Sequence, residues 1–236
     1  MTGTLINVAA ILIGGGLGLL LEGKLPERLR QTVIAGLGLF TLAFGVQMFL
    51  STKNALIVLA SLLIGGLLGE WWQLEERLQN LGARLEDRLL HTSTNNTNSR
   101  FVRGFLTASL LFGIGPMAIL GSIQDGLTGN FQTLTVKAIM DGFASLAFAS
   151  SLGVGVLFSS LIVLVYQGGI SLMALQVQKV VTDGMMAEMT AVGGVILLAI
   201  AISSLLEIKK IRAGNFLPAL LIALVIVFGL EKFGLY

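Results

Sequence analysis

The chain has 236 residues, of which 55% are hydrophobic and only 12% are charged, with a formal net charge of +2. An ordinary soluble domain carries about 25% charged residues, so this composition excludes one. Apolar runs near the length of a membrane-spanning helix recur along the chain, and they predict an all-α integral membrane protein with about eight spans. The sequence lacks the alternating ten-residue pattern of a transmembrane β-barrel.

The polar residues argue against several other classes of protein. No dense cluster of Lys and Arg is interleaved with aromatics, so we expect no nucleic-acid partner. The absence of Cys excludes disulfides and thiolate metal sites. The single histidine, His91, follows a polar helix, and no Ser/His/Asp set or metal-ligand spacing surrounds it. We therefore expect no enzyme activity, no metal and no cofactor.

Hydropathy divides the chain into three parts. Residues 1–72 form a three-helix membrane unit, 73–100 a cytoplasmic amphipathic helix followed by a polar linker, and 101–236 a five-helix membrane unit. Leucines at steps of three and four with charges between them predict the amphipathic helix over 73–91. The expected spans are about 4–21, 32–50, 55–72, 101–123, 134–150, 154–166, 185–206 and 216–230.

Two of these spans are irregular. Gly113-Ile-Gly-Pro116 should kink or break the span over 101–123, because proline removes a backbone donor and clashes with the preceding turn. The span over 154–166 is short, and Gln167-Gly-Gly169 interrupts it. We expect a re-entrant or interfacial segment near 168–183. Discontinuous helices of this kind frame ion and substrate sites in transporters.

Loop charges indicate an orientation. Basic residues concentrate in loops 22–31, 73–100 and 207–215, so the positive-inside rule places these loops in the cytoplasm and both termini outside. The glycine-rich segment Leu12–Gly18 matches Leu63–Gly69 at all but one position, which suggests an internal repeat. Gly14 and Gly18 form a GxxxG pair that allows close helix approach, and with the leucines of 74–89 it makes a homo-oligomer plausible.

Seven polar residues are candidates for a binding site. Lys137 and Asp141 lie four residues apart on one helix face within an apolar segment. A charge at membrane depth costs at least ~2.5–3.5 kcal/mol, so a retained one marks a candidate functional site. We expect this pair to form the core of a site for a small charged or zwitterionic solute. The other candidates are Asp125, Gln124, Glu188, Gln167 and Asn7.

Each candidate also has a structural interpretation. Lys137 and Asp141 could only fasten their helix to its neighbours, Asp125 could cap a turn, and Asn7 could hold two helices together. As a set, these residues favour a secondary transporter or permease, and a buried carboxylate among them would suit coupling to a proton or an ion. The alternatives are a passive channel lined by the same groups, and a structural or regulatory membrane protein whose surface helix docks a cytoplasmic partner.

Several motifs resemble a bacterial family of uncharacterised multi-pass inner-membrane proteins, typified by YqgA and YdfK. The resemblance implies a location in the bacterial inner membrane and adds no substrate. One departure is Asn130, where we would expect an acidic residue; it weakens the case for a cation site in the loop after Asp125. The motifs that carry the resemblance are Thr2-Gly-Thr-Leu-Ile-Asn7, Gly115-Pro-Met-Ala-Ile-Leu-Gly-Ser-Ile-Gln-Asp-Gly126, Lys137-Ala-Ile-Met-Asp-Gly142, Tyr166-Gln-Gly168 and Asn215-Phe-Leu-Pro-Ala219.

Overall fold

The computed structural model describes residues 1–21, 24, 26–90, 100–234 and 236. His91 and the polar linker predicted over 92–99 lie outside these residues. All regular elements of the described residues are helical, which confirms the all-α prediction. In chain order they are α1 (Thr2–Leu21), α2 (Glu27–Phe49), α3 (Ala55–Trp71), α4 (Leu74–Leu90), α5 (Arg100–Gly113), α6 (Pro116–Thr128), α7 (Gln132–Leu152), α8 (Gly155–Leu172), α9 (Ala174–Gln178), α10 (Asp183–Ile200), the π-helix η1 (Ala201–Leu205), the 3-10 helix η2 (Ala213–Phe216) and α11 (Pro218–Lys232).

The helices form two compact units that are interleaved along the chain. Unit 1 comprises Met1–Leu37 and Leu78–Lys179, and unit 2 comprises Gly38–Arg77 and Val180–Tyr236. The division predicted from the sequence, into 1–72, 73–100 and 101–236, cuts the chain into consecutive parts. Each of the two compact units instead combines two separate segments of the chain. Each unit is described by itself below.

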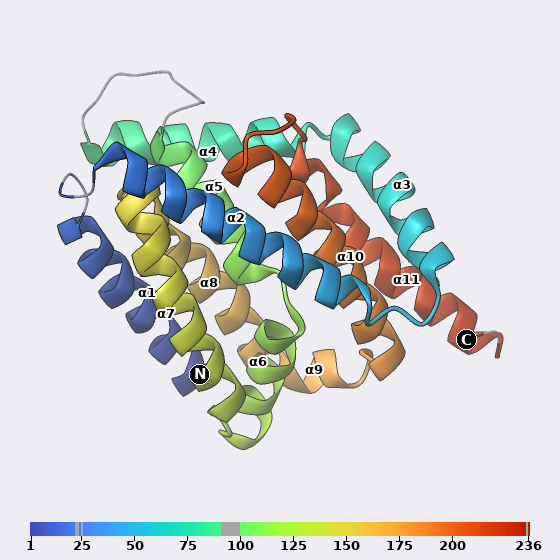
Figure 1. Ribbon diagram of the computed structural model, residues 1–236. Helices are drawn as coiled ribbons and strands as arrows, with labels where there is room; N and C mark the ends of the chain where they lie inside the picture. The colour runs from blue at the N-terminus through green and yellow to red at the C-terminus, as the bar shows by residue number, and fades with distance from the viewer. Residues whose placement is uncertain (22–23, 25, 91–99, 235) are drawn as a thin grey trace. The chain divides into compact units, whose positions relative to one another are not determined.

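Unit 1 is organised around the packing of α1 against α7 (Figure 1). A Cβ added at Gly14 would lie 2.1 Å from the carbonyl oxygen of Gly142, and one at Gly18 would lie 2.3 Å from that of Leu146. Glycine therefore lets the two backbones approach closely. At the start of both helices Gly3 faces Leu134, so α1 and α7 run parallel. Helix α8 packs against both, and α5 and α6 pack against α8.

The predicted amphipathic helix is confirmed as α4, and it packs against α5 through Ala83 and Leu85. Ala83 of α4 packs into a buried cluster with Phe101, Val102 and Phe105 of α5. Leu81, one of the predicted leucine stripe, is 42% exposed. Leu81 therefore lies outside the face of α4 that is buried in unit 1, so only part of the leucine stripe is used for packing there.

The predicted break near Pro116 is also confirmed. Helix α5 ends at Gly113, α6 begins at Pro116, and the two axes differ by 61°. Gly115 between them has φ of +155°, a conformation that is strained for residues with a Cβ. Proline at the first position of α6 costs no hydrogen bond there, because that N–H would have no partner within the helix.

The predicted interruption at Gln167-Gly-Gly169 is wrong. Helix α8 runs without a break from Gly155 to Leu172 and is long and apolar enough to cross a membrane by itself. The sequence pattern failed here because glycine lowers helix stability by only about 1 kcal/mol, and packing overrides that cost. The segment predicted to be re-entrant near 168–183 is reduced to the short helix α9 and its flanking turns.

In unit 2, as in unit 1, glycine residues allow helices to pack closely. Helix α3 packs against α11, η2 and α10. A Cβ added at Gly65 would lie 2.3 Å from the backbone nitrogen of Ala219, and one at Gly69 would lie 1.8 Å from the carbonyl oxygen of Asn215. Since the later glycine meets the earlier residue, α3 and α11 run antiparallel.

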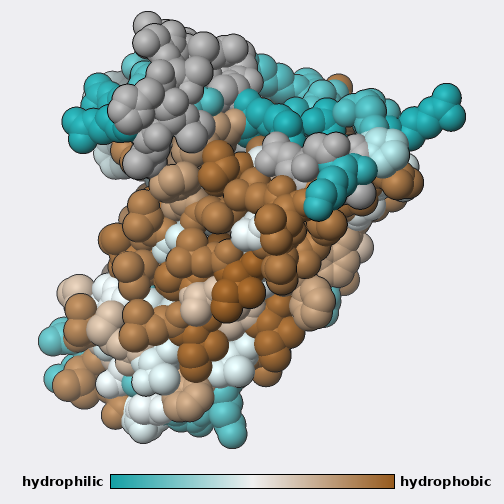
Figure 2. Space-filling model, turned by 90° about the vertical axis from the view of Figure 1, so that its left-hand side faces the viewer, coloured by the Kyte–Doolittle hydropathy of each residue, from teal (hydrophilic) through white to brown (hydrophobic). Residues whose placement is uncertain are grey.

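Among the residues that the structure describes, five single helices, or up to seven spans if each of two bent pairs counts as one, are long and apolar enough to cross a membrane. Helix α7 is not among them, because Lys137 and Asp141 lower its hydropathy. It runs beside α1 from end to end, so a membrane that α1 crosses is also crossed by α7. Figure 2 shows a face of the protein dominated by hydrophobic residues, with hydrophilic residues gathered at its upper and lower margins. Such a surface suits contact with lipid.

Candidate functional site

A cluster of four polar side chains lies in the interior of unit 1. Lys137 and Asp141, one turn apart on α7, form an ion pair between Nζ and Oδ2. They are 6% and 8% exposed. Gly142, the residue after Asp141, contacts Gly14 at the closest point between α7 and α1. The pair therefore lies where the interface of α1 and α7 excludes solvent.

The other two members come from α1 and α8. The Nδ2 of Asn7 donates to Oδ2 of Asp141 at 3.0 Å and to Oε1 of Gln167 at 3.3 Å. Both amide side chains are fully buried. Because a carboxylate only accepts hydrogen bonds, Asn7 must direct its NH2 group toward Asp141. The bond to Asn7 then fixes the oxygen of Gln167, so both amide orientations follow from the network.

This network leaves two polar atoms without a partner among the described residues. They are Oδ1 of Asn7, an acceptor, and Nε2 of Gln167, a donor. Buried polar atoms are almost always hydrogen-bonded, and a missing bond costs about 1–3 kcal/mol. The cluster thus combines a charge pair with an unused acceptor and an unused donor, which together can bind a small polar molecule.

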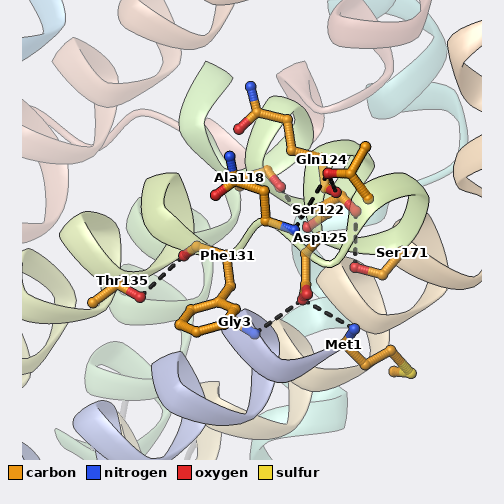
Figure 3. Close-up of polar contacts among 11 residues, drawn as sticks. Met1, Gly3, Ala118, Ser122, Gln124, Asp125, Phe131, Thr135 and Ser171 are labelled. Carbon is orange, nitrogen blue, oxygen red and sulfur yellow. Dashed lines mark hydrogen bonds and ion pairs between the residues drawn. The ribbon is translucent and has the colours of Figure 1, made fainter.

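Asp125 lies at the start of α1. Its side chain projects from the last turn of α6, and Oδ2 accepts the backbone N–H of Gly3 at 2.9 Å (Figure 3). The same oxygen lies 3.1 Å from the α-amino group of Met1. Asp125 is 3% exposed, and its Oδ1 has no partner among the described residues. It caps α1, one turn from Asn7.

Gln124 and Glu188 are not part of this cluster. Gln124 is exposed on α6, and its Oε1 accepts the hydroxyl of Thr133 at 2.8 Å. Glu188 belongs to α10 in unit 2 and is fully buried. It accepts four hydrogen bonds, from Oγ1 of Thr52, the backbone N–H groups of Lys53 and Asn54, and the hydroxyl of Tyr236. These bonds occupy the carboxylate and hold the turn between α2 and α3.

Tyr236 lies beyond the last helix, over a pocket of about 440 Å³ that Lys53 and Glu231 also line. Burial and the hydrogen bond to the Glu188 carboxylate raise the pKa of Tyr236 to about 12. The Nζ of Lys53 lies 5.8 Å from the centre of its ring. These contacts fasten the C-terminal segment to the α2–α3 turn.

Polar residues that were not among the seven candidates are buried as well, and Thr4 and Asn215 are two of them. Thr4 is fully buried on α1, and its Oγ1 has no partner among the described residues. Its spacing of three residues from Asn7 could have indicated it. Asn215 binds Oε2 of Glu70 at 2.6 Å and the N–H of Glu75 at 2.7 Å, which ties η2 to the bend between α3 and α4. Pro218, three residues after Asn215, is the first residue of α11.

The described residues contain no group of three or more His, Asp or Glu side chains that could hold a metal ion. The candidate residues that are buried in unit 1 are instead one lysine, two carboxylates and two amides held between helices. Fold and cluster together define an all-helical integral membrane protein with a charged, partly unsatisfied interior.

The chain belongs to the family described as "Protein of unknown function (DUF554)", which matches residues 2–228. It is 32% identical over 222 residues to the "Uncharacterized protein YqgA" of Escherichia coli (strain K12), covering 94% of each chain. It is 31% identical over 239 residues to the "Uncharacterized membrane protein YdfK" of Bacillus subtilis (strain 168), covering 100% of this chain and 99% of that one. No solved structure matches. The family resemblance inferred from sequence motifs is confirmed.

Proposed function

We propose that this protein is a secondary transporter for a small charged or zwitterionic solute, bound at the cluster of Lys137, Asp141, Asn7 and Gln167. The observation that carries the proposal is the pair of buried, unpartnered amide atoms beside a buried ion pair. A cluster that only fastened helices together would be expected to satisfy its own hydrogen bonds. A solute with a carboxylate and an amine, or with an amide, could use both atoms.

The broken span supports the same function. Helices α5 and α6 are two halves separated by Gly115, and α6 contacts both α7 and α8, which carry three members of the cluster. Half-helices next to a buried polar site allow local movement that opens the site to one side and then the other. The Lys137–Asp141 pair would exchange partners as the solute enters.

We test the proposal with purified protein in proteoliposomes, comparing wild type with the double variant Lys137→Met/Asp141→Leu. Replacing a buried ion pair by apolar residues of similar volume is often neutral for stability. We therefore expect the double variant to fold and to lose solute binding and uptake. A thermal-shift screen of amino acids, small carboxylates, amines and amides supplies the solute for the flux assay.

Lys53→Met serves as the matched control, because Lys53 belongs to unit 2 whereas all four residues of the cluster belong to unit 1. Uptake by the double variant at the wild-type rate would contradict the proposal. Conductance that follows the solute gradient without saturation would indicate the passive channel instead.

We also propose the bacterial inner membrane as the location, with both termini outside. In unit 1, Arg100 at the start of α5 donates to the carbonyl of Ser151, close to the end of α7 and the start of α8. Arg84 follows Ala83, which packs against Phe101 at the same end of α5. The positive-inside rule assigns that end to the cytoplasm. Because the chain has no Cys, single cysteines at positions 53 and 209 can be labelled with an impermeant maleimide in intact cells; we expect labelling at 53 only.

A further inference from the structure

We propose that Thr4, Asn7 and Asp125 form a binding site for a sodium-sized monovalent cation at the first turns of α1. Its role as a coupling ion rests on the transport function proposed above, whereas the binding itself can be measured without it. Asn7 belongs to both proposed sites: its Nδ2 binds Asp141 and Gln167 in the solute cluster, and its Oδ1 would contact the cation and the bound solute together. Thr4 and Asp125 are not members of the solute cluster.

Each of the three residues contributes an oxygen that lacks a partner among the described residues. These atoms are Oγ1 of Thr4, Oδ1 of Asn7 and Oδ1 of Asp125. Thr4 and Asn7 are 0% exposed and Asp125 is 3% exposed. Three unsatisfied buried oxygens around the start of α1 would be costly together, and a single ligand that they share would remove that cost.

The contacts of α1 place these residues next to one another. Asp125 accepts the N–H of Gly3, the residue before Thr4 (Figure 3). Thr4 and Asn7 are three residues apart on the buried face of α1, and side chains at that spacing are neighbours. Helices α1, α6 and α8 contact one another in pairs here. The three residues therefore lie together around the first two turns of α1.

The chemistry of the three groups favours a cation. A hydroxyl, an amide carbonyl and a carboxylate are the hard oxygen ligands that alkali and alkaline-earth ions prefer. A single carboxylate suits one positive charge. Asp141 does not add to this charge, because Lys137 already pairs with it.

Helix dipoles do not oppose a cation at this level of unit 1. Helix α1 and helix α7 begin here, whereas α6 and α8 end here, since Gly126 contacts the carbonyl of Ser171. Two positive and two negative helix ends offset each other, so the charge of Asp125 dominates. The Met1 amino group lies 3.1 Å from Oδ2 of Asp125, the oxygen that also accepts the N–H of Gly3. Oδ1 of Asp125 is the oxygen that remains for the cation.

The loop after Asp125 is not part of this site. The side chain of Asn130, where an acidic residue was expected, accepts the backbone N–H of Gln132 at 3.1 Å. The presence of Asn130 in place of an acidic residue therefore weakens a cation site in this loop only. It does not affect the three oxygens proposed at the start of α1.

The test uses purified full-length protein prepared in choline chloride. Melting temperature and calorimetric binding are measured as NaCl replaces choline chloride at constant ionic strength, with KCl and methylammonium chloride as parallel series. The variants are Asp125→Asn and Thr4→Val, and the control is Thr133→Val, whose hydroxyl binds the exposed Gln124. Thr4→Val keeps the shape of the side chain and removes only the ligand oxygen.

We expect saturable stabilisation of wild type and of Thr133→Val by NaCl. The apparent affinity should fall about tenfold or more in Thr4→Val, since even losing an outer partner of a metal ligand has effects of that order, and Asp125→Asn should not respond. Equal NaCl responses in all four proteins, or no saturable response in wild type, would overturn the cation site. A response to methylammonium but not to Na⁺ would also overturn it, and would assign the oxygens to an organic ammonium.

The two proposals fail separately. If uptake of the solute continues undiminished in choline, the coupling role is wrong while the transporter stands. If the Lys137→Met/Asp141→Leu variant still takes up solute, the transport site is wrong, and the NaCl response of Asp125→Asn still decides the cation site.

Discussion

Gly3 and Asn54 make the same contact in different parts of the chain: the backbone N–H of each donates to a buried carboxylate. Gly3 donates to Asp125 at 2.9 Å and Asn54 to Glu188 at 3.0 Å. The offset between Gly3 and Asn54 is the one that aligns Leu12–Gly18 with Leu63–Gly69. The sequence repeat therefore corresponds to a repeated local structure, a glycine-rich helix whose first turn is capped by a carboxylate from another helix.

The two caps differ in how far they are satisfied. Glu188 accepts four hydrogen bonds within unit 2, whereas Asp125 retains an unpartnered oxygen. A saturated carboxylate has little capacity left for a ligand, and one with a free buried oxygen does. This contrast supports the proposal that Asp125 binds a cation, and it assigns no such role to Glu188.

The Glu188 cap should matter for stability. In Glu188→Gln one carboxylate oxygen becomes an NH2 group that faces donors, and charge-assisted bonds are worth about 1.5–3 kcal/mol each. We expect the free energy of unfolding to fall by at least about 2 kcal/mol, seen as a lower melting temperature in detergent. Glu76→Gln on exposed α4 is the control and should melt with wild type.

Tyr236 should make stability depend on high pH. Its pKa in the folded protein is raised to about 12 from the ordinary value of 10. The unfolded chain therefore loses the phenolic proton first, so the stabilisation is complete below about pH 10 and is lost as the pH rises toward 12. We expect melting temperature to fall less steeply between pH 10 and 12 in Tyr236→Phe than in wild type. Parallel curves would show that Tyr236 is not coupled to folding.

Gly14 should not tolerate alanine, although Gly16 should. A Cβ at Gly14 would lie 2.1 Å from the Gly142 carbonyl oxygen, whereas at Gly16 it would meet no atom within 4 Å. Forcing α1 and α7 apart should cost about 1–3 kcal/mol or more, and Gly16→Ala should gain roughly 0.5–1 kcal/mol through helix propensity. Guanidine or thermal unfolding of both variants measures the difference; equal effects would mean that α1 and α7 do not pack as described.

The ion pair of α7 should show strong coupling in a double-mutant cycle. Lys137→Met alone leaves the Asp141 carboxylate buried with Asn7 as a remaining donor, and breaking a buried pair costs about 3–5 kcal/mol. The double variant Lys137→Met/Asp141→Leu should recover most of that loss. If the losses of the two single variants simply add, the charges do not interact in the folded protein.

Much of the fold was predictable because hydropathy and glycine patterns are local signals. The break between α5 and α6 follows from Gly115 and Pro116, and the amphipathic α4 follows from charges spaced at helical period. The end of α8 was not predictable, because Gly168 and Gly169 lower helix propensity only slightly and the packing of Gly168 and Ser171 against neighbouring chain segments maintains the helix.

The candidate site was predictable only in part. Lys137 and Asp141 are recognisable as charges in an apolar segment, and their pairing follows from helix geometry. Asn7 and Gln167 were singled out as polar residues at membrane depth, but their bonds to the pair join segments more than a hundred residues apart. Gln124 and Asp125 are adjacent in sequence, and the helix directs one to the exterior and the other to α1.

The sequence alone determined three features: the class of helical membrane protein, the residues at which most helices begin and end, and the charges that lie among apolar residues. Composition and periodicity act over a few turns of chain, so they are enough to define these features. Only the tertiary structure decided which of these charges meet. The close approach of α1 and α7 at glycines brings Asn7 to Asp141, and the return of α6 to the start of α1 leaves an oxygen of Asp125 buried and unpaired. Those contacts depend on how helices far apart in the chain pack together, and no local pattern encodes that packing.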